Sequence, residues 1–368
     1  MASFFDVLLQ EYPSGLGVQN LLAAKLFGVD ESRTVTGNGA AELIRALAFQ
    51  VSGTVGVIQP SFNEYAESFA RNPAVRVKEY VPDRFAYTPD DLVRFAQGCD
   101  VLVLINPDTP TGHYIPRNAA LTLAGTLKAA RKLLILDESF ADFACADEEP
   151  TLFREEVLGA YPNLVVVKSL SKSYGIPGIR LGVAACGDLS LVEALRSRLS
   201  IWNINAYAEY FLQIIGKYQK EYRSACKRIM EERTRFREAL IETGLFEVYP
   251  SQANYLFCRL INGMTAHAFA EGMLQEARIF IKDFTGKKGI PGDSFIRLAV
   301  RNREDNAIFI ERVGLTFRFL SYTPPPPPPP IKLARSFLGG FTSRRLRGTT
   351  RSQGWKEKGR RLVRPRVI

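Results

Sequence analysis

Short, nearly continuous runs of Val, Ile and Leu alternate with helix-length amphipathic segments between residue 31 and about residue 205, and this alternation constrains the fold most. Unbroken apolar runs are typical of strands buried on both faces of a parallel sheet, whereas half-buried strands alternate apolar and polar residues. The intervening segments have the length of helices that connect parallel strands, as at 119–131. The expected strands are 54–58, 101–105, 132–136, 164–167 and 181–185.

The chain after residue 205 indicates a smaller α+β domain. Residues 206–240 are rich in Glu, Lys and Arg and predict one or two long helices. We then expect a strand at 254–258, a helix at 266–276, and strands at 279–282 and 294–300. The predicted organisation is an N-terminal segment, a large α/β domain with a mainly parallel sheet, connecting helices with a small C-terminal domain, and a tail. Their expected bounds are 1–30, 31–205, 206–311 and 312–368.

The expected tail differs sharply in composition from the rest of the chain. Seven consecutive prolines at 324–330 can form only extended polyproline II, and the remainder is rich in Arg, Gly and Ser without periodicity, which is typical of disorder. Residues 312–368 hold 14 Lys or Arg and one acidic residue, which gives this segment a net charge of +13. Because the whole chain has a net charge of +10, residues 1–311 carry a net charge of −3. Such a tail can bind nucleic acid or a membrane surface, but it says nothing about the folded part.

Several protein classes are excluded by simple counts. No apolar run approaches the roughly 20 residues needed to cross a bilayer, and the N-terminus has neither a basic leader nor a cleavage pattern. The five cysteines are scattered without a CxxC pair, which favours reduced thiols over a disulfide framework or a zinc site. The histidines, His113 and His267, are too few and too far apart for a metal cluster. We therefore expect a cytoplasmic protein without a metal or a membrane span.

Three polar residues follow three successive expected strands: Asn106, Asp137 and Lys172. Ligands of open α/β sheets bind outside the carboxyl ends of the strands, so these residues are expected at one edge. A lysine amine with a lowered pKa can condense with an aldehyde. A partly desolvated aspartate needs a cationic partner, and a protonated pyridine nitrogen is one. Taken alone, Lys172 could be a surface lysine in a Gly-rich turn, Asp137 a helix N-cap, and Asn106 part of an ordinary turn.

Other residues are suited to binding a phosphate or a planar ring. Hydroxyls and a guanidinium surround Lys172 in sequence, in the residues Ser169, Ser171 and Arg180. Gly39 and Ala40 open an amphipathic helix whose free N–H groups can bind an anion, although a plain strand-to-helix turn is the alternative. Phe62 could stack on a ring or belong to the core. Arg297 lies in an expected strand and is either a site residue or a surface charge.

The motifs resemble, in their order, those of class I/II aminotransferases, which are fold-type I enzymes of pyridoxal 5'-phosphate (PLP). The matching segments are the helix start at Gly39, the Asn-Pro-x-x-Pro-Thr-Gly loop from Asn106, the Asp137-Glu138-Ser139-Phe140 sequence, and the Ser-x-Ser-Lys segment that contains Lys172. The resemblance covers about residues 11–311. It is strongest to the branch of histidinol-phosphate aminotransferases and threonine-phosphate decarboxylases.

The resemblance implies a PLP cofactor and a role for each matching residue. Lys172 is expected to hold the cofactor as a Schiff base and to move protons, and Asp137 to pair with the pyridine nitrogen. Tyr12 is expected to reach the cofactor phosphate of a second subunit, which implies a homodimer. Arg297 is expected to bind the substrate carboxylate, and Lys282 stands where the branch often has an Arg for a substrate phosphate. The remaining implied contacts are Asn106 at the ring hydroxyl, Phe62 stacked on the ring, and Gly39, Ala40, Ser169, Ser171 and Arg180 at the cofactor phosphate.

Three features depart from the family pattern. Phe140 stands where many members have a Tyr that bonds the ring hydroxyl, and the sequence at 137–143 favours the decarboxylase side of the branch. The family's N-terminal arm is expected to be truncated within 1–30, and an aberrant reading frame is expected from Arg312. Some bacterial members follow a nucleotidyltransferase domain in one polypeptide.

We therefore expect an enzyme that transaminates a small amino acid, with or without a phosphate group. Two alternatives stay open. The first is decarboxylation of a phosphorylated amino acid, because the same cofactor chemistry serves both reactions and the substrate geometry decides which bond breaks. The second is a non-catalytic remnant whose basic tail binds nucleic acid through phosphate contacts.

Overall fold

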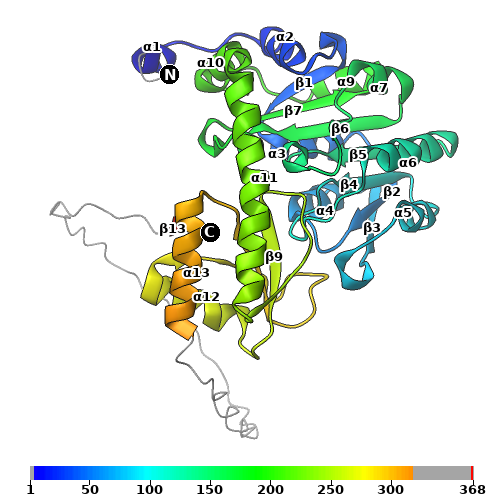
Figure 1. Ribbon diagram of the computed structural model, residues 1–368. Helices are drawn as coiled ribbons and strands as arrows, with labels where there is room; N and C mark the ends of the chain where they lie inside the picture. Colours follow the sequence, from blue (N-terminus) through cyan, green and yellow to red (C-terminus); the bar gives the residue numbers. More distant parts are fainter. Residues whose placement is uncertain (1–3, 318–365, 368) are drawn as a thin grey trace, which may run out of the picture.

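The computed structural model describes residues 4–317 and 366–367, and its largest element is a seven-stranded sheet (Figure 1). The strand order is β1-β7-β6-β5-β4-β2-β3. Only β7 runs antiparallel to its neighbours, so the expected α/β class with a mainly parallel sheet is confirmed. The strands are β1 Thr34–Asn38, β2 Gly53–Ile58, β3 Val75–Tyr80, β4 Val101–Ile105, β5 Leu133–Asp137, β6 Leu164–Ser169 and β7 Leu181–Cys186.

Five of these strands lie where the apolar runs predicted them, and β1 and β3 were not predicted. β3 forms one edge of the sheet and alternates Val with Arg, Lys and Glu, so it lacks the continuous apolar run of a central strand. β1 forms the other edge and ends in Gly37-Asn38. β3 is only partly buried, as edge strands often are. β1 is buried at four of its five residues, but its two threonines and its glycine interrupt the apolar run.

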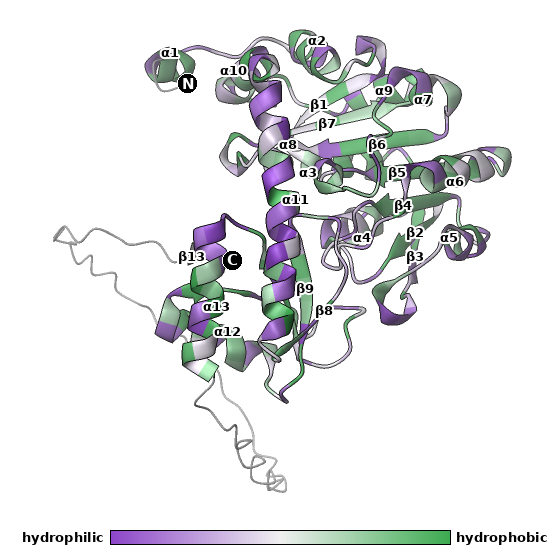
Figure 2. Ribbon diagram, viewed as in Figure 1, coloured by the Kyte–Doolittle hydropathy of each residue, from purple (hydrophilic) through white to green (hydrophobic). Residues whose placement is uncertain are grey.

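Helices cover both faces of the large sheet (Figure 1). All five residues of β4 are buried, and each apolar side chain removed from water in this way contributes about 1.5–3 kcal/mol. Figure 2 shows the result as hydrophobic strands between helices that carry hydrophilic outer faces. The helices packed on one face are α2 Leu16–Phe27, α5 Pro89–Ala96, α6 Arg117–Ala129, α7 Glu155–Ala160 and α10 Ala206–Ile215, and those on the other face are α3 Ala40–Ala48, α4 Asn63–Ala70 and α9 Leu189–Arg196.

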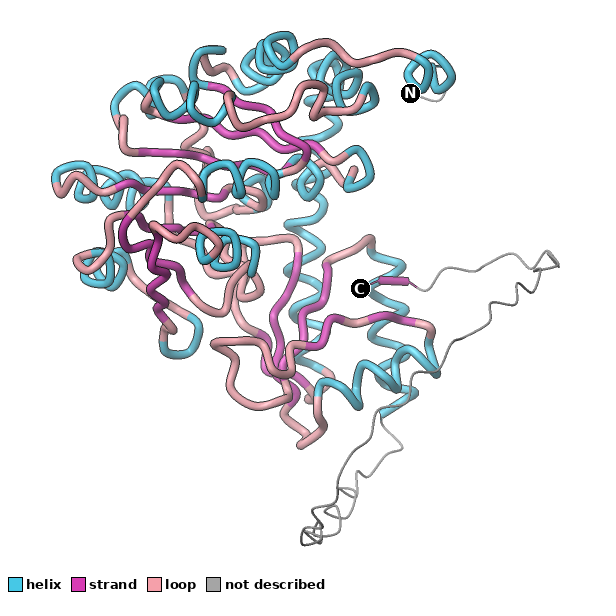
Figure 3. Tube along the Cα trace, turned by 180° about the vertical axis from the view of Figure 1, so that it is seen from behind, coloured by secondary structure: helices cyan, strands magenta, loops and turns pink. Residues whose placement is uncertain are grey.

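A second, smaller sheet is separate from the large one (Figure 3). Its four antiparallel strands have an apolar core of their own. Its order is β11-β12-β9-β8. Helices α11, α12 and α13 supply the other half of that core. The bounds are β8 Phe246–Val248, β9 Tyr255–Leu260, β11 Lys282–Asp283, β12 Phe295–Ala299, α11 Gln219–Glu242, α12 Ala266–Ala277 and α13 Arg303–Phe317.

Two sequence expectations for this region are wrong. The single strand expected at 279–282 is two short strands, β10 Ile279–Phe280 and β11, which join different sheets; β10 pairs with β13, Arg366–Val367. The expected tail boundary at Arg312 falls inside α13, because Val313 and Phe317 are buried in the core of the small sheet. The predictions of disorder and of nucleic-acid binding for the remaining tail concern residues 318–365 and 368, which lie outside the described residues.

Helix α11 runs beside both sheets and ties them together (Figure 1). Its buried Arg233 donates hydrogen bonds to the carbonyl oxygens of Phe143, in the large sheet's connections, and Ala253, which precedes β9, at 2.8 and 2.9 Å. Helix α1, Phe5–Gln10, packs on α10 near the N-terminus. Within 4–317 and 366–367, no helix combines the length and apolar character that a bilayer crossing requires.

Candidate active site

The carboxyl ends of β4, β5 and β6 bring the predicted residues to one edge of the large sheet. The amide N of Asn106 donates to the carbonyl of Asp137 at 2.8 Å, and the amide N of Glu138 donates to the carbonyl of Val167 at 2.8 Å. The amide N of Ser169 then donates to Ser139 Oγ at 3.0 Å. These bonds join the ends of the three strands, so the residues that follow the strands lie at one edge of the sheet, as predicted from the sequence.

Asp137 is buried at the end of β5 and is held by two donors. Tyr65 Oη donates to Asp137 Oδ2 at 2.8 Å, and the amide N of Ser139 donates to Oδ1 at 2.9 Å. Burial raises the pKa of Asp137, while the Ser139 and Tyr65 hydrogen bonds and the charge of Lys172 oppose the rise. Because burial makes the charged form of this carboxylate costly, a cation placed beside it, such as a protonated ring nitrogen, would stabilise it. Tyr65, inside α4, was not predicted, since nothing in its sequence surroundings points to Asp137.

Lys172 lies in the single-turn helix α8, Leu170–Ser173, just after β6. Its side chain keeps accessible surface, while Leu170, Ser171 and Ser173 are buried. Desolvation of the amine is the main cause that lowers the pKa of Lys172, and the charges of Arg297 and Arg180 lower it further against the opposing charge of Asp137. An amine that loses its proton more easily than a free lysine is suited to act as a nucleophile.

The start of α3 has the geometry expected of an anion-binding corner. Gly39 precedes α3 with a φ of 73°, and a Cβ there would lie 2.6 Å from Arg180 Nη2, so the guanidinium lies directly over this helix start. A Cβ on Gly182 would lie 2.4 Å from the amide N of Ala40, which shows how closely β7 approaches the same turn. Backbone N–H groups at a helix start and an adjacent guanidinium are the usual elements of a phosphate site.

Ser169 and Ser171 complete this corner. Ser169 pairs with Gly182 across β6 and β7. Ser171 Oγ is buried and has no hydrogen-bond partner among the described residues. A buried hydroxyl without a partner is costly, and a ligand phosphate oxygen would satisfy it. The residues therefore fit the phosphate end of PLP.

Asn106 is buried, and its side chain is largely used by the protein itself. Its Nδ2 donates to the carbonyl of Ile115 at 2.8 Å, and its Oδ1 accepts from the amide N of Ile115 at 2.8 Å. An amide nitrogen carries two hydrogens, so one N–H remains for a ligand. The contact with a ring hydroxyl stays a prediction, but the structure fixes the orientation of the amide that would make it.

A cleft of about 450 Å³ opens between the two sheets, and three further predicted residues line it: Phe62, Lys282 and Arg297. Phe62 immediately precedes α4 and is 47% exposed, so it is not a core residue. Arg297 in β12 donates from Nη1 to Thr109 Oγ1 at 2.9 Å and lies 4.8 Å from the centre of the Tyr255 ring. Burial lowers the pKa of Arg297, with Tyr255 opposing. Lys282 in β11 pairs with Arg297 across the strands and lines the same cleft.

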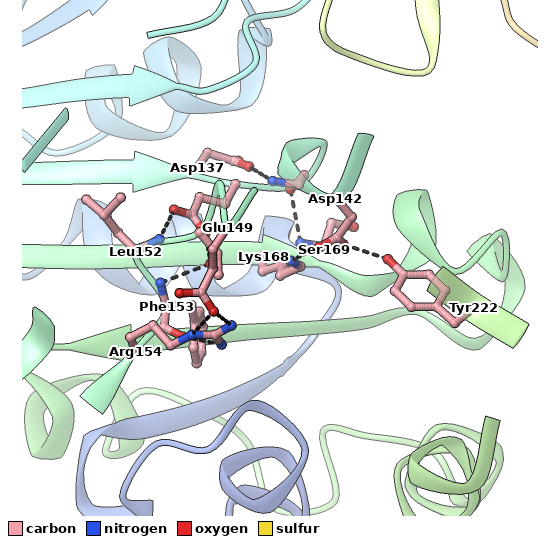
Figure 4. Close-up of polar contacts among 12 residues, drawn as sticks. Asp137, Asp142, Glu149, Leu152, Phe153, Arg154, Lys168, Ser169 and Tyr222 are labelled. Atoms are coloured by element: carbon pink, nitrogen blue, oxygen red, sulfur yellow. Dashed lines mark hydrogen bonds and ion pairs between the residues drawn. The ribbon is translucent and has the colours of Figure 1, made fainter. Parts of the chain in front are cut away.

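Behind the active-site edge lies a buried ionic network that the sequence did not reveal (Figure 4). Lys168 Nζ contacts Asp142 Oδ1 at 2.7 Å, and Tyr222 Oη donates to Asp142 Oδ2 at 2.6 Å. Glu138, next to Asp137, accepts from the amide N of Leu152 at 2.6 Å and from the hydroxyl of Thr151. The ring of Phe140 packs edge-on against the ring of Tyr255, with the ring centres 5.0 Å apart. The network ties the connection after β5, which begins next to Asp137, to β6, the strand that leads into Lys172.

Tyr12 is the one predicted residue that lies on an outer surface. It is 78% exposed and stacks on Trp202 with ring centres 4.4 Å apart. Tyr12 therefore does not line the cleft described above. This position is compatible with a residue that serves the site of a second subunit.

Comparison with known proteins gives the family. The profile of the class I and II aminotransferases matches residues 12–313. The chain is 34% identical over 312 residues to the L-serine phosphate decarboxylase of Sulfurospirillum multivorans, covering 82% of this chain and 78% of the relative. The solved structure of a decarboxylase from the same organism has a TM-score of 0.74 at 31% identity, covering 81% of this chain and 85% of that one.

A further relative is the CMP-5'-(3-aminopropyl)phosphonate synthase of Streptomyces rubellomurinus, 33% identical over 85% of this chain. This chain spans about half of that relative's length, 49%. Histidinol-phosphate aminotransferases also match, such as that of Ruminiclostridium cellulolyticum at 26% identity over 84% of both chains.

The chain therefore belongs to the class I and II aminotransferase family, and its fold is that of the fold-type I PLP enzymes. Enzymes of this family depend on pyridoxal phosphate, so the expected cofactor class and the resemblance are both confirmed. The reaction and the role of each residue are matters of proposal.

Proposed function

We propose that the protein is a PLP-dependent decarboxylase of small amino acids that carry a phosphate or phosphonate group. The observation that carries the proposal is the cleft beside Phe62, where Arg297 and Lys282 have no carboxylate partner among the described residues. Two such cations favour a substrate with an anionic group besides its α-carboxylate. Relatives named for serine phosphate and for a phosphonate are 34% and 33% identical, above the 26% of the histidinol-phosphate aminotransferase. The aminotransferase expected from sequence is thus the less well supported reaction.

Each site residue has a role in this proposal. Lys172 would hold the cofactor, with Asp137 at the ring nitrogen and Phe62 against the ring face. Bound PLP supplies an electron-withdrawing ring that makes the bonds at the substrate's Cα easier to break. Asn106 would offer its free N–H to the ring hydroxyl. The remaining contacts would be those of Gly39, Ala40, Ser169, Ser171 and Arg180 with the phosphate.

The protein's own part in the reaction is to hold the substrate and to move one proton. Arg297, fixed by Thr109, would bind the α-carboxylate with its planar guanidinium, and Lys282 would face the second anionic group. Loss of CO2 leaves the bonding electrons at Cα, and the Nζ of Lys172 would then deliver a proton to that carbon. Its lowered pKa favours the easy exchange of this proton.

The reaction is tested by products. The loaded enzyme is incubated with L-serine phosphate, with L-serine as the control that lacks the phosphate, and CO2 and keto acid are measured together. We expect CO2 in amounts equal to the substrate consumed, no keto acid, and little reaction with L-serine. Keto acid without CO2 would show an aminotransferase instead.

We also propose that the enzyme is a homodimer in which Tyr12 of one copy reaches the cofactor phosphate of the other. Large apolar side chains are exposed in the N-terminal segment that contains Tyr12 and at Ile201 and Trp202, the latter stacked on Tyr12, and such exposed side chains are often covered by a partner. They are Phe4, Phe5, Val7, Leu9, Val18, Leu21, Ile201 and Trp202. Sedimentation of the purified protein should give twice the chain mass, and Tyr12→Ala should weaken PLP binding. A monomer with normal PLP affinity would contradict this arrangement.

A further inference from the structure

A third cation, Lys287, lines the cleft that holds Arg297 and Lys282. It lies in the loop between β11 and β12, and its Nζ donates to Asn63 Oδ1, in the residue that follows Phe62. Among the described residues, Lys287 contacts no carboxylate at ion-pair distance. Asp108 and Glu67 act on it only through their more distant charges. The cleft thus gathers three positive charges next to the proposed ring-stacking residue.

The neighbouring lysine in the same loop is arranged differently. Lys288 forms an ion pair with Glu79 near the end of β3, and most of its side chain is exposed. Lys287 is only partly exposed, and desolvation lowers its pKa, with the charges of Lys282 and Arg297 acting in the same direction. Two adjacent lysines therefore differ in that one already has its counter-ion and the other does not.

The loop holds Lys287 in place through contacts with the large sheet. Gly289 has a φ of 80°, and a Cβ there would lie 2.7 Å from the backbone N of Pro60, so the loop backbone packs directly against the end of β2. Within the loop, the amide N of Lys287 donates to the carbonyl of Phe284 at 3.0 Å, and the amide N of Ile290 donates to the carbonyl of Lys287 at 3.1 Å. Lys287 is therefore presented to the cleft by a folded turn that contacts both sheets.

We infer that Lys287 is a specificity-determining residue that binds, together with Lys282, the phosphate or phosphonate group at the far end of the substrate. This inference rests on the proposed function and adds the residue that selects the substrate. Arg297 would be matched by the α-carboxylate, which leaves the two lysines for a second anion. A phosphate monoester carries about two negative charges at neutral pH and several acceptor oxygens, which two ammonium groups can neutralise.

The experiment compares Lys287→Met with Lys288→Met in the PLP-loaded enzyme. Binding of L-serine phosphate, L-serine and inorganic phosphate is followed through the absorbance of the bound cofactor, with inorganic phosphate read as a competitor. We expect Lys287→Met to weaken L-serine phosphate binding roughly ten- to a hundredfold, the size of one hydrogen bond to a charged group. L-serine binding should stay unchanged, and Lys288→Met should bind all three as the natural enzyme does. Lys287→Arg should restore part of the affinity, which separates lost charge from a disturbed loop.

Failure of this inference and failure of the proposed reaction give different results. Equal weakening for L-serine and L-serine phosphate, or no weakening for either, would overturn the role of Lys287. If the natural enzyme prefers L-serine phosphate but releases keto acid instead of CO2, the role of Lys287 stands and only the decarboxylase assignment falls. If the natural enzyme binds both amino acids equally, the substrate class and the role of Lys287 fall together.

Discussion

Lys168 and Lys172 lie four residues apart in sequence and in opposite electrostatic surroundings. Lys168, in β6, is buried behind the active-site edge and contacts Asp142 (Figure 4). Burial favours its neutral form, but the charges of Asp142 and Glu138 outweigh burial, so the pKa of Lys168 is raised. Lys172, in α8, has no carboxylate at ion-pair distance within the described part of the chain, and its pKa is lowered.

Burial favours the neutral form of both lysines, and the charged partners decide whether the pKa is finally raised or lowered. Lys168 stays charged because the two carboxylates of Asp142 and Glu138 are near it, and it neutralises negative charge that would otherwise be buried without a partner. Desolvation lowers the pKa of Lys172, and the charges of two nearby arginines lower it further, so the amine gives up its proton more readily. The same contrast recurs in the cleft, where Lys288 is paired with Glu79 and Lys287 is not.

The largest expected effect is on stability and concerns Lys168. Lys168→Met leaves Asp142 and Glu138 without their buried cation, and loss of one partner of such a pair costs about 3–5 kcal/mol. Urea unfolding of the protein without cofactor measures this. Lys172→Met, the matched control, should change the free energy of unfolding by no more than about 0.5 kcal/mol. Similar losses in both variants would remove the distinction between the two lysines.

A smaller effect is expected on substrate binding. Arg297→Lys keeps the charge but loses the planar pair of donors, so amino-acid binding should weaken by about 1.5–3 kcal/mol, or roughly ten- to a hundredfold. The cofactor band itself should remain, and titration with substrate measures the affinity. An unchanged affinity would place the carboxylate site away from β12.

The smallest expected effect is a shift in the pH dependence of cofactor attachment to Lys172. The neutral amine attacks the cofactor aldehyde, and the pKa of Lys172 lies below the ordinary 10.5, so the attachment rate should rise with pH to a midpoint below 10.5. Arg297→Gln removes one of the charges that lower this pKa, and the midpoint should move upward. Since desolvation is the larger cause, the midpoint should stay below 10.5. Stopped-flow mixing with PLP across a pH series gives both midpoints, and a downward shift would contradict the stated charges.

Much of the site could be predicted because its residues follow consecutive strands. Asn106, Asp137 and Lys172 each come just after an apolar run, and parallel strands place such residues at one edge. Arg297 and Lys282 were predicted only through resemblance to the family. Their meeting with Phe62 depends on how the two sheets pack, which no local pattern encodes.

The residues that the sequence did not reveal act through contacts over long sequence distances. Tyr65 reaches Asp137 across 72 positions, and Tyr222 reaches Asp142 across 80. The edge strands β1 and β3 were missed because they lack continuous apolar runs. The start of the tail was placed too early, at Arg312, because the burial of Val313 and Phe317 depends on packing against the small sheet.

The most direct test of this account is the position of the covalent bond to the cofactor. The PLP-loaded enzyme is reduced with borohydride, digested, and the modified lysine is located by mass spectrometry. We predict the label on Lys172, none on Lys168, and no label in Lys172→Ala. Label on Lys168, or an undiminished label in Lys172→Ala, would contradict the assignment of the reactive amine and the electrostatic contrast on which it rests.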